Sequence, residues 1–282
     1  MNDNVINITA VLRDELAAND KPDLVDPAAV PLRYSTAKLI AQSPLHYWYA
    51  TQQGSFEETL STRLGSGTHA ILFGTPYVTW HGRRASKAWE AFEEEHSGEV
   101  ILNQTEYTRA VTMAAAIRSH PIAYRLLFTD TVIEQQINWE WQGRSWRSTP
   151  DAASRTACVD LKCLRSAEPD KVKWQSRNMA YHVQAAIYRR ALNSTGKHNI
   201  KDNYLIVVEN RAPHPVTVLR FTESAIEAGD RTAAGWLEQV LACEAQGFYP
   251  GYAQTIVDLE LPMTDFIFDD DQDSEEEMEI DL

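Results

Sequence analysis

The feature that most constrains this chain is a pair of strand-like segments that carry two aspartates and a lysine close together. The segment WRSTPD ends at Asp151, and nine residues later the segment VDLK holds Asp160 and Lys162. Because side chains alternate between the faces of a strand, Asp160 and Lys162 are predicted to share one face, with Val159 and Leu161 on the other. Such a set can hold a hard divalent cation and orient water against a phosphodiester. An Asp-x-Lys triplet arises by chance about once in a chain of this length, so its surroundings decide its meaning.

Length and composition exclude several classes of protein. The 282 residues are 44% apolar, enough to bury a substantial core in one elaborated domain or two small ones. The three cysteines (Cys158, Cys163 and Cys243) form no Cys-x-x-Cys pair, which argues against a disulfide framework and a four-cysteine cluster. The sequence contains no apolar run of membrane-spanning length and does not begin like a signal peptide. We therefore expect a cytoplasmic protein.

The acidic charge is concentrated at one end of the chain. The net charge is −14, but residues 263–282 hold ten acids and no base, which leaves 30 acids and 26 bases in residues 1–262. A body so close to neutral can carry a basic groove for DNA. The acidic tail is expected to be disordered. It is either a solubilising extension or, given apolar anchors such as Phe266 and Leu282, a segment that docks on a protein partner or on its own DNA groove.

The pattern of apolar residues predicts a mixed α/β domain at residues 31–262, after a flexible segment at 1–30 and before the tail at 263–282. Its first part is expected to be helical, and its second part a mixed sheet of four or five strands flanked by helices. The expected helices are 35–41, a short one from Pro44, 62–73, 86–96, 106–128, 178–192 and 223–245. The expected strands are 132–141, 144–149, 157–162, 204–209 and 216–221.

Several short motifs occur in the order that is typical of one nuclease family. They are Ser43-Pro44, LGSGTH (64–69), Glu134, Pro150-Asp151, Asp160-Leu161-Lys162, YHVQAAIY (181–188) and GFYPGY (247–252). Over about Leu32 to Tyr252 the chain thereby resembles the PD-(D/E)xK nucleases, and within them the RecE (exonuclease VIII) branch of phage recombination modules. The resemblance implies a restriction-endonuclease-like fold with a mixed central sheet flanked by helices.

The resemblance also implies an activity and its partners. It implies a 5′→3′ exonuclease that degrades one strand of linear duplex DNA to leave 3′ single-stranded overhangs for recombination by strand annealing. Mg²⁺ is the implied cofactor, with Mn²⁺ as a substitute. It further implies a ring-like trimer or tetramer that works with a single-strand annealing or single-strand-binding protein, in the cytoplasm of a bacterium or phage-infected cell.

The residues expected to hold the metal are carried over from the family's motifs. His69, Asp151 and Asp160 become the metal-ligating side chains, and the backbone carbonyl of Leu161 completes the set. A lone helical histidine is more often a packed or capping residue, but the glycines before His69 and its place ahead of the acidic strands favour the ligand role. Glu134 matches a recurring family acid, although a solvated strand position explains it equally well.

The remaining site residues concern catalysis and DNA binding. Lys162 is expected to orient or activate the attacking water, or to neutralise charge in the transition state, and the sequence leaves these roles open. Gln184 and Tyr188 lie one helical turn apart, with Tyr181 on the same stripe. The resemblance implies that this helix lines the active site and contacts DNA, with Tyr181 as a DNA-binding residue; an amphipathic helix with aromatics in the core is the alternative. The basic residues expected to contact phosphates are Arg177 and Lys173, followed by Lys171, Arg189 and Arg190.

Two other functions share this pattern. A repair or restriction endonuclease can be built on the same fold and metal site, because neither decides whether ends or internal positions are cut. A DNA-end-binding module without catalysis is the third possibility, but the complete set of Asp151, Asp160 and Lys162 argues against it. A comparison of linear and closed-circular substrates separates the three.

Overall fold

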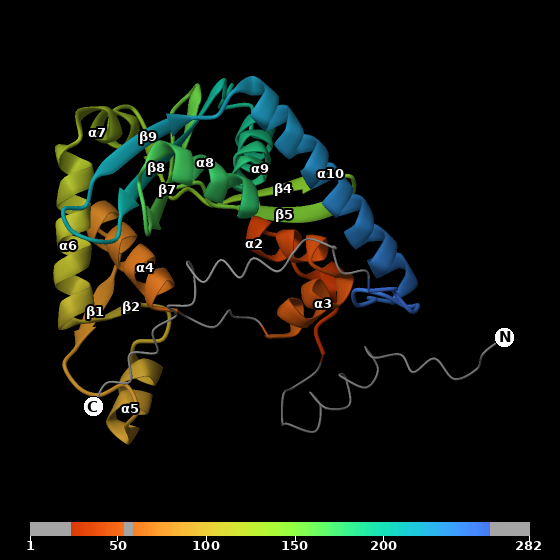
Figure 1. Cartoon of the computed structure of the whole chain (residues 1–282), viewed down its shortest axis with the longest axis horizontal. Coiled ribbons are helices and arrows are strands. Elements are labelled where there is room, and N and C mark those ends of the chain that lie inside the picture. Colours follow the sequence, from red (N-terminus) through yellow and green to blue (C-terminus); the bar gives the residue numbers. More distant parts are fainter. Residues whose placement is uncertain (1–23, 54–58, 260–282) are drawn as a thin grey trace, which may run out of the picture. The chain divides into compact units, whose positions relative to one another are not determined.

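A computed structural model describes residues 24–53 and 59–259, and Figure 1 shows the elements that they form. The helices are η1 (Pro27–Ala29), α2 (Tyr34–Ala37), η2 (Lys38–Ala41), α3 (Pro44–Gln53), α4 (Leu60–Phe73), α5 (Lys87–Glu95), α6 (Gln104–Ser119), α7 (Pro121–Phe128), α8 (Pro169–Asn178), α9 (Tyr181–Ser194) and α10 (Glu223–Gln246). The strands are β1 (Tyr77–Trp80), β2 (Val100–Asn103), β3 (Val132–Ile133), β4 (Ile137–Trp141), β5 (Arg144–Ser148), β6 (Ala152–Ala153), β7 (Ala157–Leu164), β8 (Asp202–Glu209) and β9 (Val216–Arg220).

The central sheet has five strands in the order β3-β6-β7-β8-β9. Only β7 and β8 run parallel; the other neighbours are antiparallel. A parallel pair needs a crossover connection, and here α8 and α9 supply it between β7 and β8. The prediction of a mixed sheet flanked by helices, with a helical N-terminal part, is confirmed.

The alternation of side chains along β7 and β8 assigns different helices to the two faces of the sheet. Val159 and Leu161 lie in a buried cluster with Met113 of α6 and Leu127 of α7. On the opposite face, Leu205 and Val207 of β8 pack with Val172 of α8 and Tyr181 of α9. In the β7–β8 register, Asp160 and Lys162 are the partners of Leu205 and Val207. The predicted acid and lysine therefore share the face that α8 and α9 cover.

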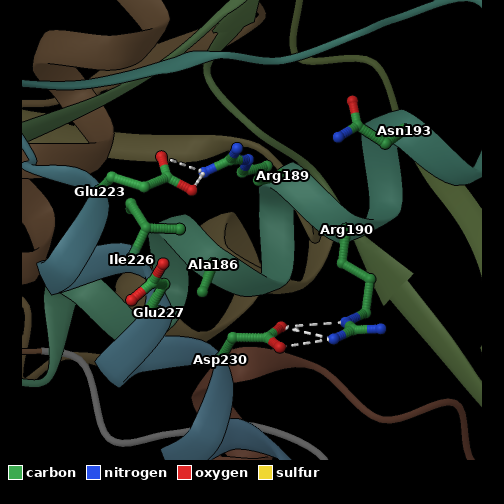
Figure 2. Close-up of a pocket in the computed structure, with 8 residues that line it drawn as sticks. All are labelled: Ala186, Arg189, Arg190, Asn193, Glu223, Ile226, Glu227 and Asp230. Atoms are coloured by element: carbon green, nitrogen blue, oxygen red, sulfur yellow. Dashed lines mark hydrogen bonds and ion pairs between the residues drawn. The ribbon is translucent and has the colours of Figure 1, made fainter.

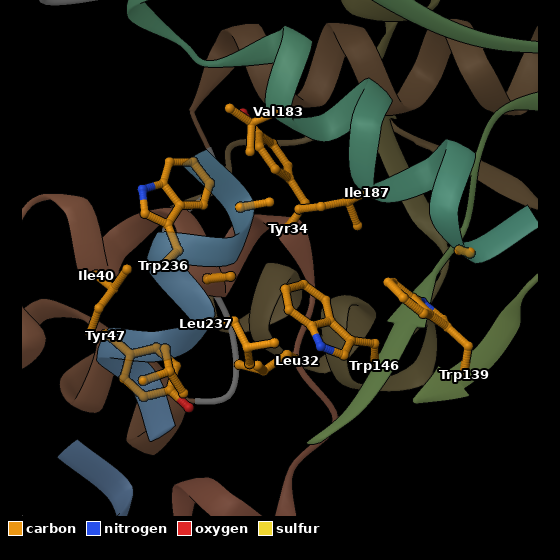
Figure 3. Close-up of a cluster of buried hydrophobic side chains, with 14 of the residues drawn as sticks. Leu32, Tyr34, Ile40, Tyr47, Trp139, Trp146, Val183, Ile187, Trp236 and Leu237 are labelled. Carbon is orange, nitrogen blue, oxygen red and sulfur yellow. The ribbon is translucent and has the colours of Figure 1, made fainter. Parts of the chain in front are cut away.

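The helical N-terminal part is attached to the rest of the domain through an aromatic core. Leu32, Tyr34 and Tyr47 pack with Trp146 of β5 and Trp236 of α10, as Figure 3 shows. A buried Arg144 secures the first described residues, because its guanidinium donates to the backbone oxygens of Pro27 and Val30 and to the Glu244 carboxylate. Residues 24–30 of the predicted flexible segment are thus bound to this core, whereas 1–23 lie outside the described residues.

Several predicted elements are interrupted or extended in the structure. The expected helix 106–128 is two helices, because Pro121 lacks an amide proton for the helix ladder and His120 caps α7 by accepting from the Ala123 amide. The expected strand 132–141 is also two, β3 and β4, because Glu134 has a φ of 46° and turns the chain between two sheets. Strand β5 pairs with β4 in a separate sheet, and an isolated bridge joins its Trp146 to Leu32.

Other corrections concern the helical segments. Helix α2 begins at Tyr34, with Arg33 at its N-cap, one residue before the predicted start at residue 35. In α4, Gly67 packs closely against β2: a Cβ atom there would lie 2.7 Å from Cδ2 of Leu102, whereas Gly65 faces open space. The sequence reading missed α8 and the parallel pair β1–β2.

Helices α9 and α10 cross at Gly229, where only a glycine fits. A Cβ atom there would lie 2.8 Å from the carbonyl carbon of His182 and 3.1 Å from Cα of Val183, both backbone atoms of α9. We expect Gly229→Ala to lower the free energy of unfolding by about 1–3 kcal/mol, because the two backbones must separate. Gly235→Ala is the matched control: Gly235 also lies within α10 and has open space around its Cβ position.

In Gly235→Ala the unfolding free energy should rise by about 0.5–1 kcal/mol, because alanine is the better helix former. Urea denaturation followed by circular dichroism measures both variants. Equal changes in the two variants would contradict the assignment of a close helix crossing at Gly229.

The compact unit of the chain ends at Tyr252, and the described residues 253–259 lie outside it. The sequence places the end of the domain at residue 262, which lies outside the described residues, as does the predicted acidic tail 263–282. Within the described ranges, no helix combines the length and the apolar character needed to cross a membrane.

Candidate active site

The predicted acid and lysine of β7 form a direct ion pair. The ammonium nitrogen of Lys162 lies 2.5 Å from Oδ2 of Asp160. Burial raises the pKa of Asp160 against the opposing effect of Lys162. Burial alone lowers the pKa of Lys162, but Asp160 and Asp151 outweigh it, so that the net shift is upward. Lys162 is therefore held as a cation, and a cation has no lone pair with which to accept a proton.

The site lies where the edge of β7 loses its neighbouring strand. Strand β6 pairs with only two residues of β7, Val159 and Cys158, so that the backbone of Leu161 is open on that side. The side chain of Asp151, which directly precedes β6, takes the place of the missing strand: its Oδ2 accepts from the Leu161 amide at 2.6 Å. On the same open edge, Nε2 of His69 lies 3.3 Å from the Leu161 carbonyl oxygen.

Three possible metal ligands gather at this edge. His69 of α4, Glu134 and Asp151 each offer one ligand atom within 4.8 Å of the others. Nδ1 of His69 lies 3.5 Å from Asp151 Oδ1 and 3.8 Å from Glu134 Oε1. Burial lowers the pKa of His69, but the two carboxylates more than compensate and raise it overall. The amide of Glu134 also donates to the Asp151 carbonyl at 3.0 Å, which fixes one acid relative to the other.

This donor set fits a divalent cation that prefers oxygen but accepts nitrogen. Two carboxylates suit Mg²⁺, Ca²⁺ and Mn²⁺, and an imidazole moves the preference towards the transition metals, so that Mn²⁺ matches the mixture well. From the sequence, Glu134 is either a site acid or a solvated strand residue, and in the structure it belongs to the cluster with His69 and Asp151. Asp160 is not one of the three gathered ligands, because its carboxylate pairs with Lys162.

The carbonyl of Leu161 stands in a different relation to the site than the family resemblance implies. It faces Nε2 of His69, while Nδ1 faces the two acids. Histidines that bind metals usually donate their other ring N–H to a carbonyl or carboxylate, which sets the tautomer and the ring orientation. In this geometry the Leu161 carbonyl can orient His69, and its role as a direct metal ligand stays a prediction.

Gln184 and Tyr188 of α9 lie together beside the β7 acids. The amide nitrogen of Gln184 donates to the Tyr188 hydroxyl at 3.0 Å. Burial, and then Asp160 and Asp151, raise the pKa of Tyr188 far above its usual value, so that it stays a neutral hydroxyl with a proton to donate. The Gln184 side-chain oxygen is buried and has no hydrogen-bond partner among the described residues. Both groups can therefore still bind a ligand.

A cleft of about 580 Å³ opens over the site between α4 and the β7–α9 segment. Its lining includes His69, Glu134, Lys162 and Tyr181. Tyr181 is 7% exposed and belongs to a buried cluster, with the ammonium nitrogen of Lys162 5.4 Å from the centre of its ring. It therefore serves both as core and as cleft wall.

The basic residues predicted to bind phosphates are distributed unequally. Arg177 and Lys173 are exposed on α8, and Lys173 is paired with Asp170 at 2.7 Å. Lys171 is likewise paired with Glu168. Arg189 and Arg190 lie in a different hollow, between α9 and α10, where Figure 2 shows them bound to Glu223 and Asp230. None of these five basic residues lines the cleft, and their contacts with phosphates stay a prediction.

The structure adds a small polar pocket that the sequence reading missed. It has a volume of about 250 Å³ and is lined by Gln184, Tyr188 and six residues of other segments: Arg33, Tyr34, Ser35, Gln136, Arg147 and Thr149. No acid lines it, and Nε of Arg147 is buried without a hydrogen-bond partner among the described residues. The available signal was the alternation of β5, which buries Trp146 and turns Arg147 to the other face.

The amino-acid sequence matches the model of one protein family over most of the described residues. Residues 34–259 match the model of a family described as a PDDEXK-like domain of unknown function (DUF3799). The chain belongs to this family. The matched range contains every side chain of the site except Arg33. No curated protein is similar enough in sequence to match.

The fold of this PDDEXK-like chain is also found in a solved structure. The crystal structure of a candidate exonuclease from Eubacterium rectale is similar with a TM-score of 0.60 and 14% identity, over 82% of this chain and 89% of that one. An alkaline exonuclease from Laribacter hongkongensis has 13% identity over 66% of this chain and 93% of that one. Its TM-score of 0.31 is too low to add to the fold assignment.

Proposed function

We propose that this PDDEXK-like protein is a metal-dependent exodeoxyribonuclease that degrades one strand of linear duplex DNA. The observation that carries the proposal is the edge of β7. There a three-residue donor set for a divalent cation, formed by His69, Glu134 and Asp151, adjoins a lysine held as a cation by Asp160. Phosphodiester hydrolysis needs both kinds of group, because negative charge builds up on the phosphate as water attacks.

His69, Glu134 and Asp151 are the residues that would hold the metal, with Asp160 beside them. Mg²⁺ or Mn²⁺ bound there would supply a polarised phosphate oxygen and a water of lowered pKa. Lys162 is placed to orient the attacking water and to neutralise developing charge, since its pKa is raised and it keeps its proton. Tyr188 can donate its hydroxyl proton to a phosphate oxygen, and Gln184 sets the position of that hydroxyl.

The polar pocket beside Tyr188 supports action from a DNA end. Two arginines without an acid among the lining residues form a site for a dianion, and a terminal phosphate carries more charge than an internal one. A pocket of about 250 Å³ is also small for a duplex but adequate for a phosphate group. We infer that it holds the 5′-phosphate of the strand being cut, which would set the 5′→3′ direction implied by the family resemblance.

The test compares linear and closed-circular duplex DNA in the presence of Mg²⁺. Loss of the linear DNA alone is the expected result; loss of both would favour an endonuclease of repair or restriction, and loss of neither would leave a DNA-end-binding module. On end-labelled linear duplex, a 5′-phosphate is expected to speed degradation roughly tenfold over a 5′-hydroxyl, which corresponds to ~1.4 kcal/mol.

The role of the pocket is tested by Arg147→Gln, which should remove this preference for a 5′-phosphate. Arg155→Gln, at an exposed arginine next to β7, is the matched control and should keep it. An Arg147→Gln enzyme that still prefers the 5′-phosphate would exclude the pocket as the end-binding site, without affecting the nuclease assignment.

The assembly and partners are part of the same proposal. A ring-like trimer or tetramer and an annealing or single-strand-binding protein fit an enzyme that makes 3′ overhangs for recombination. The acidic tail 263–282 offers that partner a polyanion with apolar anchors.

A further inference from the structure

A second hollow without any acid in its lining lies on the other side of α6 from the core. It has a volume of about 520 Å³ and is formed by one face of α6 and the turn between β8 and β9. Its lining residues are polar or basic except for one alanine: Gln104, Thr105, Thr108, Arg109, Thr112, Arg211, Ala212 and His214. None of these residues belongs to the candidate active site.

The walls of this hollow are fixed by hydrogen bonds and packing. The turn is closed by the His214 amide, which donates to the Arg211 carbonyl at 2.9 Å, and the buried His214 ring bonds the Glu209 carbonyl at 2.9 Å. Asn210, just before the turn, donates its amide to Leu164 of β7. On the other wall, α6 is held by its buried face around Met113. The hollow is therefore preformed.

The positive charge of this hollow is not compensated by its neighbours. Among the described residues, Arg109 and Arg211 have neither an ion pair nor a side-chain hydrogen bond. The nearby acids are already engaged: Glu106 binds Arg84 and Arg63, and the Glu209 carboxylate accepts from a backbone amide. The hollow of Figure 2 differs in this respect, because its two arginines are paired with acids.

Both walls of the hollow, α6 and the turn between β8 and β9, adjoin residues that line the catalytic cleft. Val100 lines the cleft and Gln104, four positions further along the chain, lines the hollow, so that at most about 14 Å of extended chain separates them. At the other wall, Leu164 lines the cleft and its register partner is Glu209, which binds His214. The separation is comparable to the major groove of duplex DNA, about 12 Å wide.

We infer that Arg109 and Arg211 bind phosphates of the duplex arm of the substrate, roughly one groove away from the wall of the cleft in which the strand is cut. The inference rests on the proposed nuclease function and extends it to the length of duplex that the protein holds. Arginine suits this role because its planar guanidinium binds phosphate oxygens in pairs. Such contacts raise affinity for any sequence and make it depend on salt.

The test measures duplex binding by Arg109→Gln, Arg211→Gln and the double variant, with chelator present so that the DNA is not cut. For a duplex of about 30 base pairs, the double variant should lose roughly tenfold in affinity, and the slope of log K against log salt should fall by about two. A hairpin with a stem of about three base pairs, roughly 10 Å long at 3.4 Å per base pair, should bind all variants equally because its duplex does not reach the hollow. Arg125→Gln, at an exposed arginine of α7, is the control for loss of one charge.

Unchanged binding of the long duplex, or equal losses on both lengths, would overturn the inference. A second probe separates this failure from failure of the nuclease assignment. Inorganic phosphate is titrated calorimetrically into Arg147→Gln, so that the end-binding pocket does not contribute. It should bind this variant, and bind the Arg147→Gln/Arg211→Gln double variant at least about tenfold more weakly, whether or not the protein cuts DNA. If the wild type cuts no DNA but phosphate binding depends on Arg211, the hollow remains an anion site and only the nuclease function fails. If phosphate does not bind, and duplex length has no effect, the site is rejected.

Discussion

Asp160→Asn is expected to reduce DNA cleavage at least about a hundredfold, equivalent to ~2.7 kcal/mol of barrier, with little change in folding. The change keeps the shape of the side chain and removes the charge that holds Lys162 at 2.5 Å. Because burial raises the pKa of Asp160, the folded protein is not stabilised by ionising this carboxyl group, and its neutral replacement should leave the melting temperature close to that of the wild type. Asp151 remains nearby as a partner for Lys162.

Lys162→Ala should cause a similar loss of activity while the metal still binds, because Lys162 is not among the gathered ligands. Rates on linear duplex DNA, circular dichroism and calorimetric titration with Mn²⁺ check the three parts of the prediction. Asp202→Asn on the neighbouring strand β8 is the matched control, since among the described residues the Asp202 carboxylate forms an ion pair with the surface residue Arg220 alone. If either site variant kept more than about a tenth of the wild-type rate, roughly 1.4 kcal/mol, the assignment of the site would be wrong.

The parts of this site that depend on strand periodicity could be predicted from the sequence. Alternation along β7 places Asp160 and Lys162 on one face and Val159 and Leu161 on the other, and the structure confirms this. The helix predicted at 62–73 is α4, which carries His69, and the last helix ends at Gly247 in the left-handed conformation as expected. Local patterns thus predicted the strand faces and helices on which these residues lie.

The grouping of those residues depends on contacts that a sequence pattern does not encode. The alternation of 132–141 reads as one strand, yet Glu134 is a turn residue between two sheets, and that turn brings its carboxylate to His69. Nothing in the sequence shows that β6 is two residues long, which opens the edge of β7 to Asp151. Arg33 and Arg147 are far apart along the chain, so their common pocket appears only after folding.

Removal of divalent metal is expected to abolish cleavage, and Mn²⁺ or Mg²⁺ should restore it, with Mn²⁺ effective at the lower concentration. The mixed donor set of one imidazole and two carboxylates is the physical reason for the order. His69→Ala should raise the metal concentration needed for half-maximal activity at least about tenfold. Loss of a residue that only hydrogen-bonds to a metal ligand already weakens metal binding by about that factor, and loss of a ligand should cost at least as much. The rate at saturating metal should change much less, because the remaining ligands and Lys162 are unaltered.

Glu134→Gln distinguishes a metal-binding role from a structural role at the same edge. The amide keeps the size of the side chain but lowers its value as a ligand, and the turn itself depends on the backbone bond between Glu134 and Asp151 rather than on the carboxylate. We therefore expect a displaced metal titration with an unchanged melting temperature. His96→Ala is the control histidine, paired with Glu99 outside the site. If the titration curves of His69→Ala and Glu134→Gln overlay that of the wild type, neither residue binds the metal and both have structural roles. Asp151 and Asp160 would then be the acidic ligand candidates that remain.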